Sequence, residues 1–119
     1  MSRDFGLVKS SLWGSSRFRR LGNDTARLAY VYLHANDHGN ANGAYRLPIE
    51  YVSADMRCSA DEARAVMADL GAVGLIRYDA TEAVVMICKW FDHNPINNPK
   101  HLMGSVKAFQ RLPSMTSFL

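Results

Sequence analysis

The sequence predicts a mainly α-helical α+β domain with a small antiparallel β-wing. Apolar residues recur at helical spacing in three consecutive segments, and two short apolar strands separated by a turn follow the third segment. The chain has 119 residues, of which 48% are hydrophobic, so it can bury one core and has no room for a second. We therefore expect one small domain.

The first 22 residues are expected to form a basic N-terminal arm that contains a strand. Apolar side chains fall on alternating faces of Phe5–Trp13, and this pattern predicts a weak strand. Gly14 interrupts the pattern, and Ser15 or Ser16 is expected to cap a short helix over Arg17–Leu21.

A longer helix is predicted next, followed by a polar loop and a short strand. Asn23 or Asp24 is expected to cap this helix, which runs to about Asn36. Its apolar residues at helical spacing are Leu28, Val31, Tyr32 and Ala35. The segment Asp37–Gly43 consists almost wholly of Asn, Asp, Gly and His, which is typical of a loop, and Ala44–Leu47 reads as a strand.

Two further helices joined by a tight turn are predicted to follow. Pro48 suits the first turn of a helix over about Pro48–Met56, and Arg57 lies in the turn after it. Ser59 and Glu62 form a capping box that starts the next helix, and Gly74 can end that helix in a left-handed conformation. The apolar stripe of this helix is Ala63, Val66, Met67, Leu70 and Val73.

The wing is predicted from Leu75–Tyr78 and Ala83–Phe91, two strands joined by the turn Asp79–Glu82. The second strand is apolar on both faces apart from Lys89, so both faces must be covered. The helices can cover one face. The other face needs the N-terminal strand, the C-terminal segment or a second subunit, and a homodimer is expected on this ground alone.

The order helix, short strand, helix, tight turn, helix, strand, turn, strand is that of a winged helix-turn-helix. In that fold the third helix crosses the other two steeply and stands out from the body, while the hairpin closes the core beside it. Residues 23–91 are expected to form this domain, after the arm of residues 1–22. Residues 92–119 are expected to form an Asn/Pro loop and a C-terminal helix that packs on or beside the domain.

Four segments that span most of the chain also resemble a known family: Leu12–Leu21, Gly43–Pro48, Ser59–Tyr78 and Trp90–Lys100. They are similar to the N-terminal winged-helix domain of bacteriophage replication-initiation proteins of the replisome-organiser and helicase-loader type. The resemblance implies a domain that binds double-stranded origin DNA, often as a dimer. It also implies a replication helicase or its loader as a partner, recruited by a further C-terminal region that this sequence does not contain.

The charge pattern places the expected DNA contacts mainly at the two ends of the sequence. Residues 1–22 carry a net charge of +4 and residues 89–119 carry +3, whereas residues 46–88 carry −3. Basic segments suit phosphate because each neutralised phosphate releases counterions. The cations expected to contact DNA are Arg17, Arg19, Arg20, Arg46, Arg57, Arg64, Lys100 and Lys107.

The third helix is a poor match to a base-reading helix. Among its early exposed positions, only Arg64 is a strong donor to guanine, whereas Asp61, Glu62 and Asp69 repel phosphate. The turn Asp79–Glu82 contains no Lys or Arg. We therefore expect a phosphate track with low sequence specificity in one subunit, strengthened by dimerisation.

Two alternatives to a replication module stay open. One is a protein-interaction winged helix, an adaptor whose acidic third helix faces a protein partner. The other is a prophage transcriptional regulator, which would use the same fold. The acidic middle of the sequence favours the adaptor, and the basic ends favour DNA.

No enzymatic, cofactor-binding or membrane motif is evident. The P-loop, the dinucleotide fingerprint and the Gly-x-Ser-x-Gly elbow do not occur, so we expect a non-enzymatic protein without cofactors. Cys58, Cys88, His93 and His101 have suitable ligand types for zinc, but their spacing fits no standard pattern and no metal is expected. No uncharged apolar run exceeds Ala83–Cys88, and the N-terminus lacks the apolar stretch of a signal peptide, so we expect a cytoplasmic protein.

Overall fold

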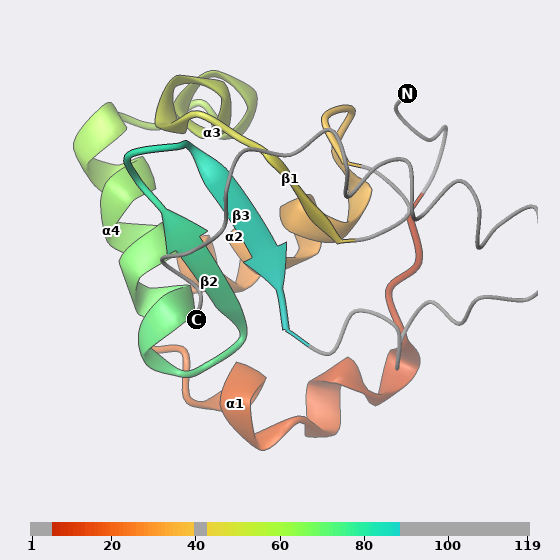
Figure 1. The fold of residues 1–119 in the computed structure, drawn as a ribbon. Helices are drawn as coiled ribbons and strands as arrows, with labels where there is room; N and C mark the ends of the chain where they lie inside the picture. The colour runs from red at the N-terminus through yellow and green to blue at the C-terminus, as the bar shows by residue number, and fades with distance from the viewer. Residues whose placement is uncertain (1–5, 40–42, 89–119) are drawn as a thin grey trace, which may run out of the picture.

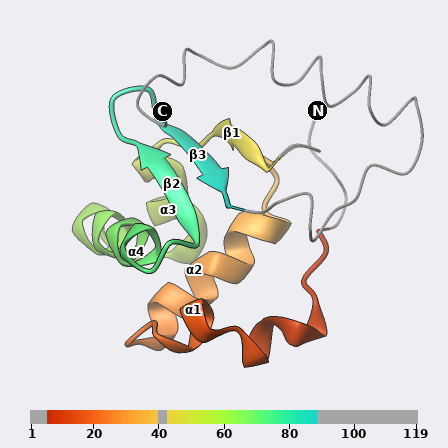
Figure 2. The ribbon, with the colours of Figure 1, turned by 60° about the horizontal axis from the view of Figure 1, so that its bottom comes forward.

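The computed structural model describes residues 6–39 and 43–88, which form an α+β fold. The described residues make a short 3₁₀ helix (η1), four α-helices and a three-stranded antiparallel sheet. Helices α2 and α4 pack together on one face of the sheet, and η1 and α1 lie at one end of the molecule (Figures 1 and 2). In chain order the elements are η1 Ser10–Gly14, α1 Ser16–Arg19, α2 Asp24–Ala35, β1 Ala44–Arg46, α3 Ile49–Met56, α4 Ala60–Ala72, β2 Ile76–Asp79 and β3 Val84–Ile87.

The helix starts confirm the predicted caps. Ser15 precedes α1 and its hydroxyl accepts a hydrogen bond from the Phe18 amide. The Asn23 side chain accepts from the third residue of α2 at 2.8 Å. At α4 the capping box is complete, because Ser59 accepts from the Glu62 amide at 3.1 Å and the Glu62 carboxylate accepts from the Ser59 amide. Each cap satisfies a backbone donor that the helix itself leaves open.

The tight turn between α3 and α4 depends on a left-handed residue. Arg57 has φ 55° and ψ 49°, and the Cys58 amide donates to the Ser53 carbonyl at 3.1 Å. The Ser53 hydroxyl donates to the Cys58 carbonyl at 2.6 Å and closes the turn from the other side. An L-residue is strained in this conformation. The two hydrogen bonds between Ser53 and Cys58 therefore stabilise a turn whose backbone is strained at Arg57.

The predicted strand over Phe5–Trp13 is wrong for its described part. Residues 6–9 have no regular structure, and Ser10–Gly14 form η1. A strand needs a hydrogen-bonding partner, and the sheet edges at β1 and β2 are not paired with this segment. Only Leu12 enters the core, while Leu7 and Trp13 are exposed, so the alternation in the sequence does not reflect a buried face.

Helix α2 buries a different face from the predicted one. Its buried residues are Ala26, Ala29, Tyr30, Leu33 and His34, whereas the prediction was Leu28, Val31, Tyr32 and Ala35. Leu28 is 58% exposed. Because the helix is apolar over most of its circumference, spacing alone did not select the face. The choice is made by α1, whose Phe18 ring packs 6.0 Å from the Tyr30 ring.

The sheet has the order β1-β3-β2, and the predicted hairpin is confirmed. Tyr78 pairs with Val85 across the hairpin, and Tyr45 of β1 pairs with Val85 from the other side. The Asp79 carboxylate accepts from the Thr81 and Glu82 amides at 2.9 and 3.0 Å, which explains the turn.

The second strand of the hairpin begins one residue later than predicted. Ala83 has φ 56° and belongs to the turn, so β3 starts at Val84. The prediction that both faces of this strand are covered holds in part, since Val84 on the outer face is 1% exposed and Met86 is half-buried. The strand also ends earlier than predicted, because β3 stops at Ile87 and Cys88 lies in a turn, while the rest of the predicted strand to Phe91 lies outside the described residues. The expected homodimer stays a prediction.

The core joins the N-terminal segment to the helices and the sheet. Leu12, Phe18 and Leu21 belong to the same buried cluster as Leu70 of α4 and Ile87 of β3. The apolar stripe predicted for α4 is confirmed for its four residues inside the helix, while Val73 is the partly buried C-cap. Among the described residues no helix combines the length and the apolar character that a bilayer crossing needs. The expected Asn/Pro loop and C-terminal helix lie outside the described ranges.

Candidate functional site

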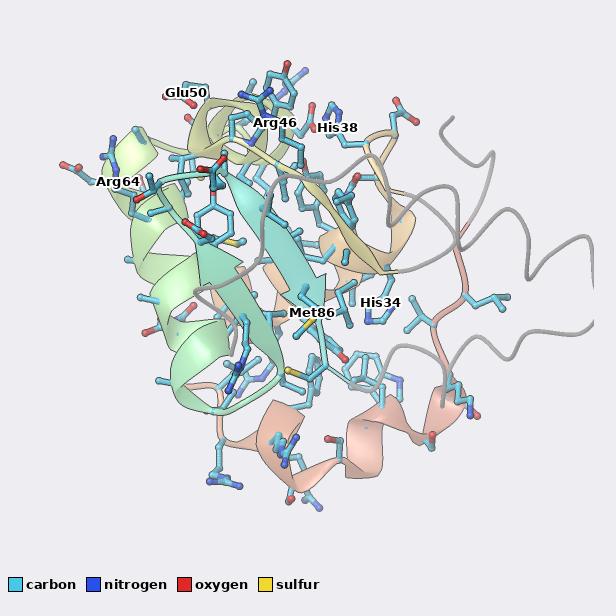
Figure 3. The ribbon with its side chains drawn as sticks, viewed as in Figure 1. His34, His38, Arg46, Glu50, Arg64 and Met86 are labelled. Atoms are coloured by element: carbon cyan, nitrogen blue, oxygen red, sulfur yellow. The ribbon has the colours of Figure 1, made fainter. Side chains whose placement is uncertain are left out.

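The expected DNA-contacting cations fall into two groups, one at each end of α4. The groups are Arg17, Arg19 and Arg20 beside the C-terminal end of α4, and Arg46, Arg57 and Arg64 beside its N-terminal end. Arg46 and Arg64 lie near α3 in Figure 3, with α1 at the opposite end of the molecule. A helix of 13 residues is about 20 Å long, so one small contact cannot include both groups. Lys100 and Lys107 lie outside the described residues.

We call the first group, Arg17, Arg19 and Arg20, the basic end. Arg17 donates from Nη1 to the Gly74 carbonyl at 3.2 Å, which fixes this side chain against the end of α4. Arg19 and Arg20 are exposed and form no ion pair with any other residue that the structure describes. Asp24, the first acid after them in the chain, is paired with Arg27 at 2.6 Å. Within residues 6–39 and 43–88, the basic end therefore presents positive charge that no carboxylate neutralises by an ion pair.

A cleft of about 380 Å³ opens at the basic end, between α1 and the segment after α4. Ser11, Ser16 and Arg17 line it together with Tyr30 and Cys88. Burial, and secondarily the nearby thiol of Cys88, raises the pKa of Tyr30 to about 12, so the phenol is neutral at physiological pH. Hydroxyl and guanidinium donors are the groups that phosphate oxygens accept from.

At the N-terminal end of α4 the cations are matched or outnumbered by acids. Arg64 pairs with Asp61 at 3.0 Å, and Arg46 and Arg57 are exposed. The acids of this end are Glu50, Asp55, Asp61, Glu62, Asp79 and Glu82. This end therefore repels phosphate over most of its area, in agreement with the negative charge expected from residues 46–88.

An apolar groove of about 510 Å³ lies between α3, α4 and the β2–β3 turn, and it extends along α4 from Arg64 near the acidic end to Gly71. Its lining includes Ile49, Met67, Ala68 and Gly71, and Tyr78 donates its hydroxyl to the Leu47 carbonyl at 2.7 Å. Burial raises the pKa of the Tyr78 phenol, and the carboxylates of Glu50 and Asp79 raise it further. No sequence pattern marks this groove, because its walls come from three segments that are distant in sequence.

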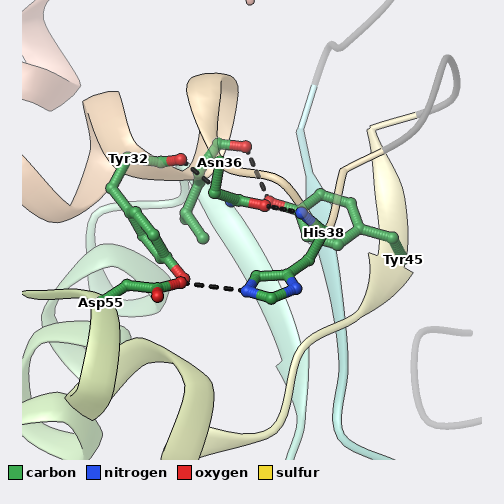
Figure 4. Close-up of polar contacts among 6 residues, drawn as sticks. Tyr32, Asn36, His38, Tyr45 and Asp55 are labelled. Atoms are coloured by element: carbon green, nitrogen blue, oxygen red, sulfur yellow. Dashed lines mark hydrogen bonds and ion pairs between the residues drawn. The ribbon is translucent and has the colours of Figure 1, made fainter. Parts of the chain in front are cut away.

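A polar cluster joins α2, the following loop and α3 (Figure 4). The Tyr32 hydroxyl donates to Asp55 Oδ2 at 2.7 Å, and His38 Nε2 lies 3.0 Å from the same oxygen. The Asn36 amide donates to the Tyr32 carbonyl and to the Tyr45 hydroxyl. The sequence did not predict these contacts, because up to 23 positions separate the partners, and Tyr32 was expected on the apolar stripe of its helix.

The titration of this cluster follows from its hydrogen bonds. Donation from Tyr32, and then the contact with His38, lowers the pKa of Asp55 below its ordinary value. Burial first, and then the bond to Asp55, raises the pKa of Tyr32. Asp55 is therefore a carboxylate and Tyr32 a phenol near neutral pH. The cluster fixes the loop after α2 to α3.

The described residues show no metal-binding constellation. Within residues 6–39 and 43–88, no three His, Cys, Asp or Glu side chains are grouped to hold an ion. Cys58 and Cys88 are free thiols. His93 and His101, the other ligands considered for zinc, lie outside the described ranges.

The two ends of α4 thus differ in chemistry. One is basic and has a cleft lined by hydroxyls and a guanidinium, and the other is acidic and has an apolar groove. Comparison with protein-family models, with curated proteins and with solved structures finds no match to this chain.

Proposed function

We propose that the chain is a winged helix-turn-helix module that binds double-stranded DNA through its basic end. The element order, the sheet order β1-β3-β2 and the hairpin that follows α4 support the winged-helix interpretation. The two short connections, Arg57–Ser59 and Val73–Leu75, place α3, α4 and the hairpin next to one another. Arg64, Ala65 and Ala68 on α4 are exposed.

The single observation that carries the DNA proposal is the uncompensated charge of Arg19 and Arg20 beside the cleft of Arg17. Phosphate contacts of this kind position a protein on the duplex without reading its sequence. The acidic start of α4 does not favour contacts with DNA bases, because the guanidinium of Arg64 forms an ion pair with Asp61. The proposed binding therefore has low sequence specificity.

The biological setting is proposed from the resemblance stated above. The module would belong to a phage or prophage replication-initiation protein, binding origin DNA as a homodimer and cooperating with a helicase or its loader. Light scattering tests the dimer, because a particle of 13.3 kDa would contradict it. A prophage transcriptional regulator is the second candidate, and footprinting on the protein's own replicon separates origin from promoter.

The test is a titration of the chain with a random-sequence duplex at two salt concentrations. Three phosphate contacts predict a loss of roughly 40-fold in affinity between 50 and 200 mM salt, and a single contact predicts roughly threefold. The double substitution Arg19→Ala and Arg20→Ala should therefore weaken binding and flatten this dependence. Arg46→Ala with Arg64→Ala removes the same charge from the acidic end and serves as the matched control.

Two results would overturn the proposal. One is the absence of binding at low salt, which leaves the adaptor interpretation. The other is unchanged binding by the Arg19/Arg20 variant together with a loss in the Arg46/Arg64 variant, because the contact would then lie at the acidic end.

A further inference from the structure

We propose that the groove between α3, α4 and the β2–β3 turn is a docking site for a protein segment that carries an apolar side chain next to a Lys or Arg. We call it the α3–α4 groove. Among the described residues it shares no lining residue with the cleft beside Arg17, so it would serve a function separate from the proposed DNA contact. It also gives the adaptor alternative a defined surface.

The shape of the α3–α4 groove suits one bulky apolar side chain. Its volume of about 510 Å³ lies in the range of ligand-binding clefts. Ile49 and Met67 provide aliphatic walls, while Ala68, Ala80 and Ala83 are small enough to leave the space open. Met side chains adapt to ligands of different shape, which favours a site for an apolar anchor.

The charge at the mouth of the groove selects a cation. Glu50 is exposed at the rim, and its carboxylate has no hydrogen-bond or ion-pair partner among the described residues. Arg64, the cation of the lining, is paired with Asp61. Glu50 thus leaves an unbalanced negative charge beside an apolar hollow. A Lys or Arg next to the apolar anchor complements it, whereas phosphate is repelled.

The exposed face of α4 beside the groove allows a polypeptide backbone to come close. Ala65, Ala68 and Ala72 are exposed on this face and present only methyl groups. At Gly71, a methyl group would meet nothing nearer than the Ile76 carbonyl at 4.0 Å, so the surface is open there too. A peptide can lie along this face while its anchor enters the groove and its cation reaches Glu50.

The experiment uses the full ¹⁵N-labelled chain and a model helical peptide of about 12 residues. The peptide has one Leu flanked by two Lys in a background of Ala and Gln. Its partner peptide has Glu at both Lys positions. We expect the Lys peptide to shift the amide resonances of Ala68, Gly71 and Ala80, and the Glu peptide to bind about tenfold more weakly or worse.

Two variants of the chain locate the effect. Glu50→Lys should weaken the Lys peptide by about tenfold or more, because like charges then face each other. Asp69→Lys is the matched control, since it makes the same charge change at an exposed acid of α4 outside the groove lining, and this variant should bind as the unaltered chain does. Amide spectra of both variants show whether they are folded.

Several outcomes would overturn the proposal. These are no resonance shift with millimolar Lys peptide, equal binding of the Glu peptide, and unaltered binding by the folded Glu50→Lys variant. Duplex DNA titrated into the same sample gives a further outcome. If DNA shifts Ala68 and Ala80, the groove is a nucleic-acid surface and the docking proposal is wrong. Failure of DNA binding at Arg19 and Arg20 leaves the docking proposal intact, so the two proposals fail separately.

Discussion

At the scale of single residues, the hydrogen bonds of Asp55 and the backbone of Arg57 hold α3 in place between its neighbours. The Asp55 carboxylate accepts a hydrogen bond from Tyr32 of α2 and contacts the His38 ring of the following loop. Arg57 reverses the chain between α3 and α4 with a positive φ. Both residues are exposed, so substituting either one should change the stability only slightly and without changing the buried apolar core.

Asp55 should make stability depend on pH in the acid range. Because its pKa is lowered in the folded state from the ordinary 3.8, it stabilises the fold at pH above that value. The stability is lost as the pH falls through the folded-state pKa. Asp55→Asn should cost on the order of 0.5–1 kcal/mol at pH 7, a modest figure because the side chain is 44% exposed.

Urea unfolding of both proteins between pH 7 and pH 2 measures this effect. The difference between the unaltered chain and Asp55→Asn should shrink toward the acid end. A difference that stays constant over this range would mean that the carboxylate charge contributes nothing. Tyr32→Phe removes the largest cause of the lowered pKa and should move the acid transition upward.

Arg57→Gly should stabilise the protein by about 0.5–1 kcal/mol. Glycine adopts positive φ without the strain of an L-side chain, which exceeds its extra entropy in the unfolded chain. Arg57→Ala is the control, because it removes the same charge but keeps the strained backbone. Thermal unfolding of the three proteins gives the comparison, and equal stability of the Gly and Ala variants would show that the turn is not strained.

Most of the side-chain contacts could not be predicted from the sequence. Helix caps were predictable because Ser59 and Glu62 act within one turn of each other. The contact of Tyr32 with Asp55 spans 23 positions, and no local pattern marks it. The same reason hid the α3–α4 groove, whose lining joins Pro48 with Met67 and Ala83.

At the scale of elements, local signals located the four α-helices that the structure describes but not the 3₁₀ helix η1, and they did not select the buried face of α2. Caps, turn residues and periodicity gave α2, α3, α4 and the hairpin close to their observed limits. Burial of α2 depends on Phe18 and Leu21, which reach it from the preceding segment. The N-terminal strand failed for the same reason, since a strand exists only with a partner.

The observed buried face of α2 predicts that two leucines of that helix contribute very differently to stability. Leu33 is 1% exposed and Leu28 is 58% exposed. Leu33→Ala should cost about 2–5 kcal/mol of unfolding free energy, because it leaves a cavity in the core. Leu28→Ala should change it by no more than about 0.5 kcal/mol. Chemical denaturation measures both, and a larger loss at Leu28 would restore the face predicted from the sequence.

At the scale of the whole molecule, basic and acidic side chains gather at opposite ends of α4, and an apolar groove extends from the acidic end along the helix. The basic end gathers Arg17, Arg19 and Arg20 around a polar cleft, and the other end places Glu50 beside an apolar groove. The uneven charge was visible in the sequence as a basic N-terminal segment and an acidic middle. The separation of the expected DNA-contacting cations into two groups was not visible in the sequence. In the fold, Arg46, Arg57 and Arg64 lie among the acids of the middle segment, apart from the basic end.

The proposed division of the surface implies that one molecule can hold DNA and a protein segment together. A duplex bound at Arg19 and Arg20 should leave the affinity of the Lys peptide for the α3–α4 groove within a factor of about 2, because the cleft at the basic end and the groove share no lining residue that the structure describes. Peptide titrations with and without saturating duplex measure this. Strong competition would show that both ligands use one surface.

The most direct test of the central claim is a map of amide shifts when a random-sequence duplex is added to the ¹⁵N-labelled chain. We predict the largest shifts at Arg17, Arg19, Arg20 and Gly74, with little change at Asp61 and Ala80. Shifts concentrated at the first turn of α4 and the β2–β3 turn, with the basic end unaffected, would contradict the account.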